Sequence, residues 1–175
     1  MKYLVIVESP AKCKKIQGYL GKDYKVVASV GHFRDLSKKD MGIDIKNNYK
    51  PTYKITKSKV VTDLKKHMRS VDKVIIATDQ DREGEAIGYH LCKVLKLDVK
   101  KTDRIVFNEI TKKAIQNAVK NVTRINLNLF YAQQARRILD RLVGFSISPV
   151  LWRNIGSRLS AGRVQSIVLK LIVEK

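Results

Sequence analysis

Acidic residues are scarce in this chain of 175 residues, which has 16 aspartates and glutamates against 36 lysines and arginines. The net charge of +20 and the pI near 10.1 exceed what solubility requires, and they favour a polyanionic partner. Nucleic acid fits this charge best, with a membrane surface as the competing polyanion. A lysine-rich organism whose proteins are all basic would also explain the charge, without any functional meaning.

Cysteine is also rare, because only Cys13 and Cys92 occur, far apart and outside any metal-type pair. We therefore expect free thiols in a reducing compartment. No apolar run approaches the ~18 residues of a membrane-spanning helix, and we find no secretory or lipidation signal. These absences favour a cytoplasmic, DNA-associated protein without a membrane partner. We expect a monomer.

Strands and helices are predicted to alternate over residues 1–123. Apolar, β-branched runs predict strands at 3–8, 24–30, 73–78 and 104–107, and helical periodicity predicts helices at 10–20, 59–69, 82–96 and 111–121. Residues 31–49 predict a long loop, with short strands near 43–45 and 53–56. This order predicts an α/β domain, residues 1–123, with a mostly parallel sheet flanked by helices. Residues 124–175 predict an all-helical segment, with helices at 126–146, 148–155 and 161–175.

Four carboxylates lie within the seven residues 79–85, directly after the apolar run 74–77. Asp79 and Asp81 are two residues apart, so an extended backbone points both side chains the same way. Mg²⁺ takes one or two such ligands and keeps positions for phosphate oxygens. Asp79 and Asp81 are therefore the primary candidate ligands, with Glu83 acting through water and Glu85 in a structural role. The alternative is an acid-rich helix start, which is a common stabilising arrangement.

Two further groups are predicted at the same sheet edge. Glu8 ends the first strand, and Lys12 lies in the first helical turn, where a cation beside free backbone N–H groups makes a phosphate site. The alternative is that Glu8 and Lys12 only pair with each other. His32 and Arg34 follow the second strand and could contact phosphate, or could simply be solvated.

Together these segments resemble the Toprim domain of the type IA DNA topoisomerases. The similarity lies in residues 7–12, 30–36, 77–87 and 107–111, and it continues in the helical tail at 132–144 and 159–166. Toprim domains also occur in primases, recombination mediators and some nucleases, whereas this tail is similar only to the topoisomerases. The resemblance implies a Rossmann-like Toprim fold and places the start of a helical, single-strand DNA-binding domain at residues 124–175.

The resemblance also implies DNA contacts in the tail. An apolar stripe on the helix near 131–143 leaves Arg137 and Arg141 on a polar face that suits phosphate. A solvated helix with an ion pair between Arg136 and Asp140 is the alternative. The residues that the resemblance assigns to DNA in this tail are Arg136, Arg137, Asp140, Arg141, Arg163 and Gln165.

The implied reaction is Mg²⁺-dependent cleavage of one strand of negatively supercoiled DNA, strand passage and religation without ATP. Glu8 would be the general acid and base, and would join the metal site, while Lys12 would stabilise the scissile phosphate. None of the seven tyrosines has the neighbours of the family's nucleophile motif, so we expect the nucleophile in the remaining domains of the same polypeptide. The chain alone is then expected to bind Mg²⁺ but not to relax DNA. A metal-dependent nuclease or primase, or a non-catalytic DNA-binding module, is the alternative.

Overall fold

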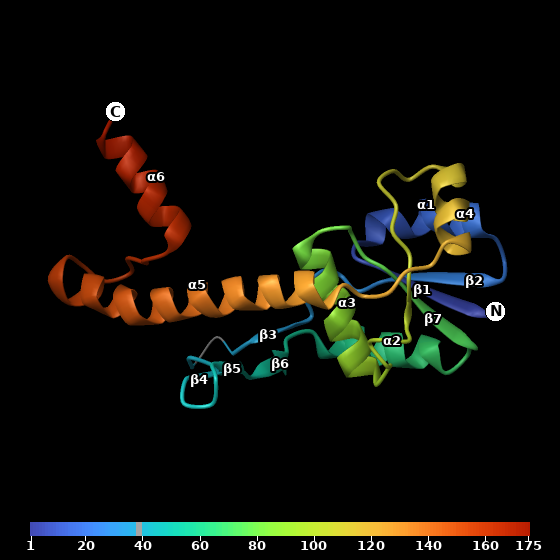
Figure 1. Cartoon of the computed structure of the whole chain (residues 1–175), viewed down its shortest axis with the longest axis horizontal. Coiled ribbons are helices and arrows are strands. Elements are labelled where there is room, and N and C mark those ends of the chain that lie inside the picture. The colour runs from blue at the N-terminus through green and yellow to red at the C-terminus, as the bar shows by residue number, and fades with distance from the viewer. Residues whose placement is uncertain (38–39) are drawn as a thin grey trace. The chain divides into compact units, whose positions relative to one another are not determined.

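A computed structural model of the chain describes residues 1–37 and 40–175 (Figure 1). Lys38 and Lys39, which fall in the predicted loop, lie outside the described residues. The chain forms two compact units: the first comprises Met1–Asp35 and Lys54–Gln133, and the second comprises Leu36–Tyr53 and Gln134–Lys175. The domain boundary expected after residue 123 stays a prediction.

A parallel sheet of four strands forms the centre of the first unit. Its order is β2-β1-β7-β8, with bounds β1 Tyr3–Val7, β2 Tyr24–Ala28, β7 Lys73–Ala77 and β8 Asp103–Arg104. In register, Val7 lies between Ala28 on one neighbour and Ala77 on the other. The β-branched runs form these buried strands because both of their faces are covered. The carboxyl ends of β1, β2 and β7 therefore lie at one edge, as expected.

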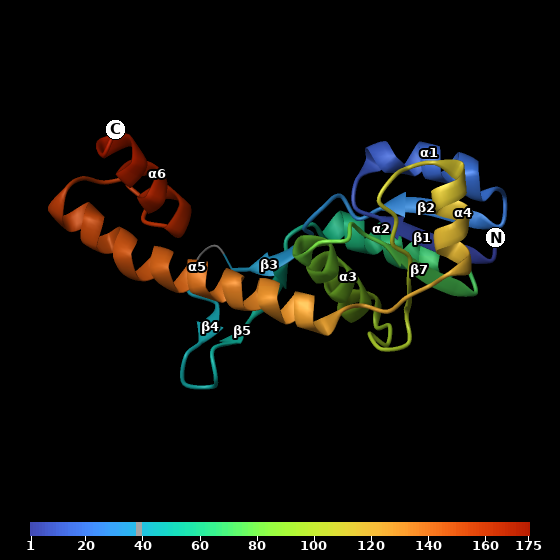
Figure 2. The same cartoon turned by 45° about the horizontal axis from the view of Figure 1, so that its top comes forward.

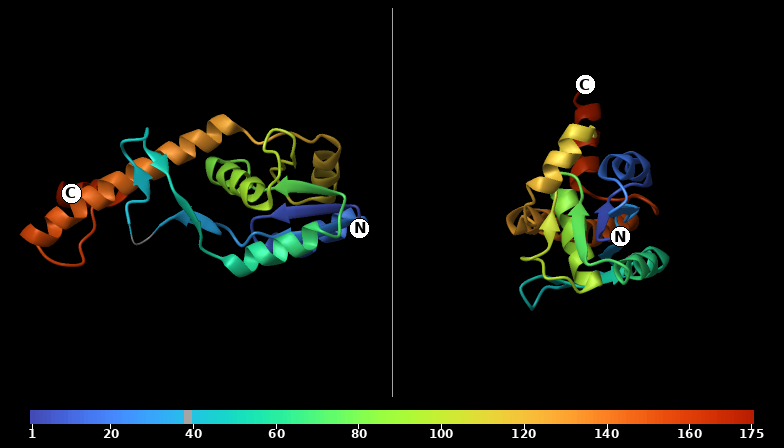
Figure 3. Two further views of the ribbon diagram at one scale, coloured as in Figure 1. Left: turned by 90° about the horizontal axis from the view of Figure 1, so that it is seen from below. Right: turned by 90° about the vertical axis from the view of Figure 1, so that its right-hand side faces the viewer.

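Two helices cover each face of this sheet (Figures 1, 2 and 3). On one face lie α1 (Pro10–Leu20) and α4 (Lys112–Lys120), over a core that includes Val5, Val7 and Ile16. On the other lie α2 (Ser58–Met68) and α3 (Arg82–Leu95), over a core that includes Leu4 and Ile6. The predicted α/β fold is confirmed.

The helix ends follow local sequence signals. Pro10 occupies the first turn of α1, as its fixed φ allows, but the Ser9 side chain makes no cap hydrogen bond. Asp81 caps α3, and Thr111 caps α4 by accepting from the backbone N–H of Ala114 at 3.3 Å.

Three expectations about the elements are wrong. The strand predicted at 104–107 is shorter and begins one residue earlier: β8 pairs with β7 only at Asp103 and Arg104. Residues 34–36, predicted as loop, form the short strand β3 (Arg34–Leu36), which pairs with β6 (Tyr53–Ile55). The break predicted at residue 147 is absent: α5 (Leu127–Asn154) continues through Pro149, although proline leaves one backbone hydrogen bond of the helix unmade.

The second unit contains the antiparallel strands β4 (Ile43–Asp44) and β5 (Lys50–Pro51), the part of α5 from Gln134, and α6 (Arg163–Val173). No described residue of α6 is buried. None of the helices in the described ranges combines the length and hydropathy of a membrane span. Both cysteines are free thiols, and burial raises the pKa of each. Cys92 lies in the core under α2 and α3.

Candidate active site

Glu8, Lys12 and Asp79 come together at the carboxyl edge of the sheet. Glu8 directly follows β1, Asp79 lies two residues after β7, and Lys12 lies in the first turn of α1. The Glu8 Oε1 accepts a hydrogen bond from the backbone N–H of Asp79 at 3.0 Å. The Lys12 ammonium makes an ion pair with the Asp79 carboxylate rather than with Glu8. The parallel pairing of β1 with β7 thus joins two motifs that are 71 residues apart.

The environment of Glu8 favours its protonated form. Partial burial raises the pKa of its carboxyl, and the negative charges of Asp79 and Asp81 raise it further. The Asp79 N–H and the Lys12 ammonium act in the opposite direction without cancelling this effect. A raised pKa moves the Glu8 carboxyl in the direction that a general acid and base requires.

The loop of residues 78–81 is held tightly against the start of α3. Asp81 accepts from the backbone N–H of Gly84 at 2.7 Å, and the Thr78 hydroxyl donates to the Gly84 carbonyl at 2.8 Å. A Cβ added at Gly84 would lie 2.1 Å from the Asp79 carbonyl oxygen, so only glycine fits. This close approach fixes where the two aspartates leave the sheet.

A buried arginine, Arg104, holds the same loop by hydrogen bonds to its backbone. Arg104 is 1% exposed and donates to the carbonyls of Thr78 and Asp79, each at 2.9 Å. Its Nε donates to Glu85 at 2.8 Å, and the second Glu85 oxygen accepts from the Asn126 N–H at 3.0 Å. Glu85 is therefore structural, as the sequence suggested, and its charge is neutralised by Arg104.

The other predicted residues of the first unit, Glu83, His32 and Arg34, each make side-chain contacts. The Glu83 carboxylate lies 3.1 Å from His32 and accepts from the Gln133 amide at 3.1 Å. The Arg34 guanidinium lies 3.2 Å from Nδ1 of His90, which must be the acceptor because a guanidinium only donates. Burial, and then the charge of Arg34, lowers the pKa of His90 to about 3, which keeps its ring neutral.

A cleft of about 450 Å³ opens beside the acidic loop. Its lining residues are Lys12, Asp79, Gln80, Asp81, Phe107, Asn108, Glu109 and Ile110. Across the described ranges, no three side chains of His, Cys, Asp or Glu are gathered so that they could hold a metal ion by themselves. The donor set still suits Mg²⁺, since hard carboxylate oxygens face an open cleft in which a phosphate could complete the coordination.

The second unit contains the remaining predicted residues. Asp140 accepts from Arg163 through both oxygens, the second at 3.0 Å, and lies 4.0 Å from Arg136. This bonding to Arg163 lowers the pKa of the Asp140 carboxyl. A cavity of about 490 Å³ is lined by Arg137, Asp140 and Arg141 together with the rings of Phe145 and Trp152. The exposed Gln165 lies beside Gly162 at the start of α6.

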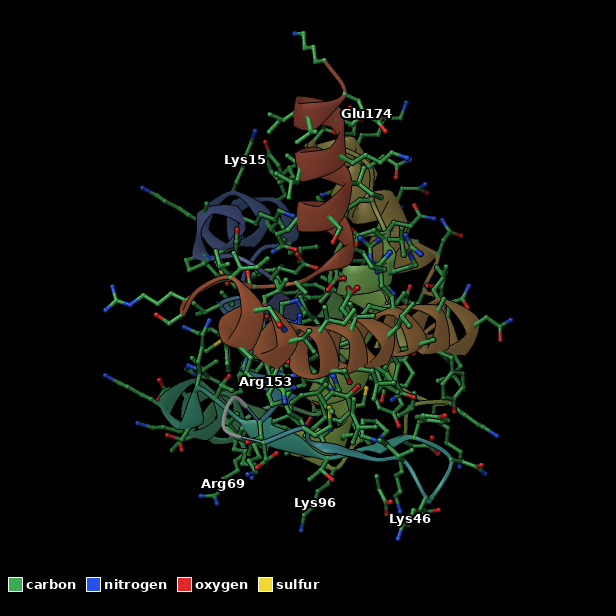
Figure 4. The ribbon with its side chains drawn as sticks, turned by 90° about the vertical axis from the view of Figure 1, so that its left-hand side faces the viewer. Lys15, Lys46, Arg69, Lys96, Arg153 and Glu174 are labelled. Atoms are coloured by element: carbon green, nitrogen blue, oxygen red, sulfur yellow. The ribbon has the colours of Figure 1, made fainter. Side chains whose placement is uncertain are left out.

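Basic side chains are spread over the surface as well as at these sites. Figure 4 shows Lys15, Arg69 and Lys96 extending away from the ribbon into solvent.

Comparison with known proteins assigns the family. Residues 3–110 match the Toprim domain family, and residues 124–175 match the DNA topoisomerase family. The chain belongs to the type IA DNA topoisomerases. It is similar to the full-length topoisomerase I from Thermotoga maritima, with 50% sequence identity and a TM-score of 0.88. The match covers 96% of this chain and 29% of the Thermotoga protein.

Two positions of this topoisomerase chain that matter for the site were missed in the sequence. The sequence predicts Arg104 only as the start of a strand, because its burial depends on Glu85 and on the carbonyls of Thr78 and Asp79. Gly84 lies inside the acidic motif, but its close contact with Asp79 also depends on the fold.

Proposed function

We propose that this chain provides the metal-binding and strand-holding part of a type IA topoisomerase that relaxes negatively supercoiled DNA. In this proposal one DNA strand is cut by a tyrosine outside these 175 residues, another strand passes through the gap, and the cut is resealed. The observation that carries the proposal is the hydrogen bond from the Asp79 N–H to Glu8, which joins the two motifs at one sheet edge.

Each residue of the site has a role that its surroundings support. Glu8, whose pKa is raised, holds a proton for the leaving 3′ oxygen and takes it back during religation. Lys12 faces the cleft and can turn from Asp79 to the scissile phosphate. Asp79 and Asp81, with Glu83 through water, are the proposed Mg²⁺ ligands. Bound there, Mg²⁺ would supply positive charge that aligns the cut ends.

The proposed DNA contacts are divided between the two units. In the first, His32 and Arg34 are held in place by Glu83 and His90. In the second, the residues around the Asp140 cluster provide cations and rings for a single strand. The proposed residues there are Arg136, Arg137, Asp140, Arg141, Arg163 and Gln165. We propose action as a monomer, in the cytoplasm where the chromosome lies.

The test uses a chimera in which residues 1–175 replace the matching segment of the Thermotoga maritima protein. We expect the chimera to relax negatively supercoiled plasmid with Mg²⁺, and Glu8→Gln to reduce the rate by about 10²-fold or more, as for a lost general acid. Lys14→Gln, which removes an exposed cation from the same helix, is the matched control and should retain the rate.

Two results would contradict the proposal. One is a chimera that relaxes DNA equally well with Glu8→Gln. The other is nicking of plasmid or primer synthesis by the 175-residue chain alone, which needs no tyrosine and would favour a nuclease or primase.

A further inference from the structure

A row of three polar residues lies at the carboxyl end of the sheet, one position beyond the last paired residues. Ala28, Val7 and Ala77 are in register on β2, β1 and β7, so the next residues are Ser29, Glu8 and Thr78. The ladder continues past β2, because the Ser29 N–H donates to the Val7 carbonyl at 2.8 Å. Ser29 and Glu8 are thus direct neighbours on adjacent strands, which lie about 4.8 Å apart in a sheet.

The side chains of this row point to the same face. Val7 and Ala28 pack in the core under α1 and α4, while Ile6 and Val27 pack in the core under α2 and α3. Because side chains alternate along a strand, Glu8 follows Ile6 and Ser29 follows Val27. Both therefore face the side of the sheet that α3 covers.

The Ser29 hydroxyl stands out in this row. Ser29 is 0% exposed, and of the buried side-chain polar atoms in the described ranges its Oγ is the one without a hydrogen-bond partner. Thr78, two strands away, donates its hydroxyl to Gly84. Buried hydroxyls are nearly always paired, because an unpaired one carries its full desolvation cost. A partner for the Ser29 hydroxyl is therefore expected in the working state.

Glu8 has such an acceptor. Its Oε1 accepts from Asp79, whereas within the described chain no hydrogen bond reaches its Oε2. Because Glu8 stands directly opposite Ser29 in the pairing of β1 with β2, this oxygen is an acceptor on the neighbouring strand.

The turn after Ser29 is strained, which is a second and independent sign of function. Val30 has φ 57°, a left-handed conformation that is unfavourable for a β-branched residue, and Gly31 follows with φ 67°. Two contacts hold this turn: Lys57 donates to the Val30 carbonyl at 2.5 Å, and the Gly31 N–H donates to the Glu8 carbonyl at 2.9 Å. Such strain persists where the surroundings impose it, and it clusters at functional sites.

We propose that Ser29 is a positioning residue for Glu8: its buried hydroxyl donates to the second carboxylate oxygen, and the Val30 turn keeps it there. The proposal rests on the proposed function only in that Glu8 is the proton-carrying group. Ser29 touches no substrate atom and acts through Glu8 alone.

The test measures amide hydrogen exchange in the 175-residue chain, with and without Mg²⁺ plus inorganic phosphate. The Asp79 amide reports on Glu8, which it bonds, and the Gly84 amide, bonded to Asp81, is the internal reference. In Ser29→Ala we expect protection of the Asp79 amide to fall about tenfold in at least one condition, as for one lost hydrogen bond. Gly84 should not change, and the thermal midpoint should hold or rise. Ser29→Cys, a weaker donor of similar size, should give an intermediate loss.

Equal Asp79 protection in Ser29→Ala and the parent chain, in both conditions, would overturn the proposal. A parallel loss at Asp79 and Gly84 with a lower midpoint would also overturn it, because the serine would then be merely structural. These readouts do not depend on DNA cleavage. An unresponsive Asp79 amide defeats this inference alone, while a fully active Glu8→Gln chimera defeats the proposed function alone.

Discussion

Lowering the pH from 7 to 5 should destabilise the first unit through one buried histidine. His90 is 4% exposed, and its pKa of about 3 lies far below the ordinary value of 6.5. In the unfolded chain the ring regains that ordinary pKa. At pH values between the two pKa values, the unfolded state therefore binds more protons than the folded state. The stability that neutral His90 provides is therefore complete above pH 6.5 and is lost as the pH falls towards 3.

The size of this effect follows from the two pKa values. At pH 5 the free energy of unfolding should be lower by about 2 kcal/mol, against about 0.2 kcal/mol at pH 7. This change in the free energy of unfolding depends mainly on the pKa of histidine in the unfolded chain, because any native pKa below about 4 gives nearly the same change. It is a large part of the roughly 5–15 kcal/mol that stabilises a domain.

The assay is urea unfolding of the chain at pH 7 and pH 5, compared with His90→Gln. The glutamine amide can still accept from Arg34 but does not titrate, so the variant should lose about 2 kcal/mol less than the parent over this interval. His67→Gln is the matched control: this histidine lies half-buried in the last turn of α2, away from Arg34, and its replacement should leave the parent's loss unchanged. Equal losses in the parent chain and in His90→Gln would refute the reasoning.

Two further predictions concern the contacts that Arg104 and Gly84 make with the acidic loop, and both are checked by the same unfolding assay. Arg104→Leu leaves Glu85 charged and buried, which should cost about 3–5 kcal/mol, and adding Glu85→Leu should recover at least half of that loss; a cost below about 1 kcal/mol would contradict the buried ion pair. Gly84→Ala should cost about 1–3 kcal/mol by overpacking against the Asp79 carbonyl. Gly18→Ala, where a Cβ meets nothing within 4 Å, should gain about 0.5–1 kcal/mol, and equal effects of the two alanines would contradict the close contact at Gly84.

The parts of the fold that depend on local patterns could be predicted from the sequence. Apolar, β-branched runs and helical periodicity located all three long strands and the four helices of the first unit within two residues at each end. The meeting of Glu8 with Asp79 also followed, because parallel strands in a helix-alternating order end at one edge.

Features that depend on tertiary partners could not be predicted in this way. The pairing of Lys12 with Asp79 instead of Glu8 depends on side-chain reach across two strands. The short strand β3 needs β6 as a partner, and its three residues are too few to show a pattern, although β6 itself was predicted near residues 53–56. The assignment of metal and DNA roles to single residues stays a prediction, since ligand binding has to be measured.

Calorimetric titration of the chain with Mg²⁺ tests the central claim most directly. We expect saturable binding by the parent chain, loss of that binding in Asp79→Asn/Asp81→Asn, and retention in Asp63→Asn/Asp98→Asn, which removes two carboxylates outside the cleft. Identical titrations of the parent chain and Asp79→Asn/Asp81→Asn would contradict a metal site at the carboxyl ends of β1 and β7.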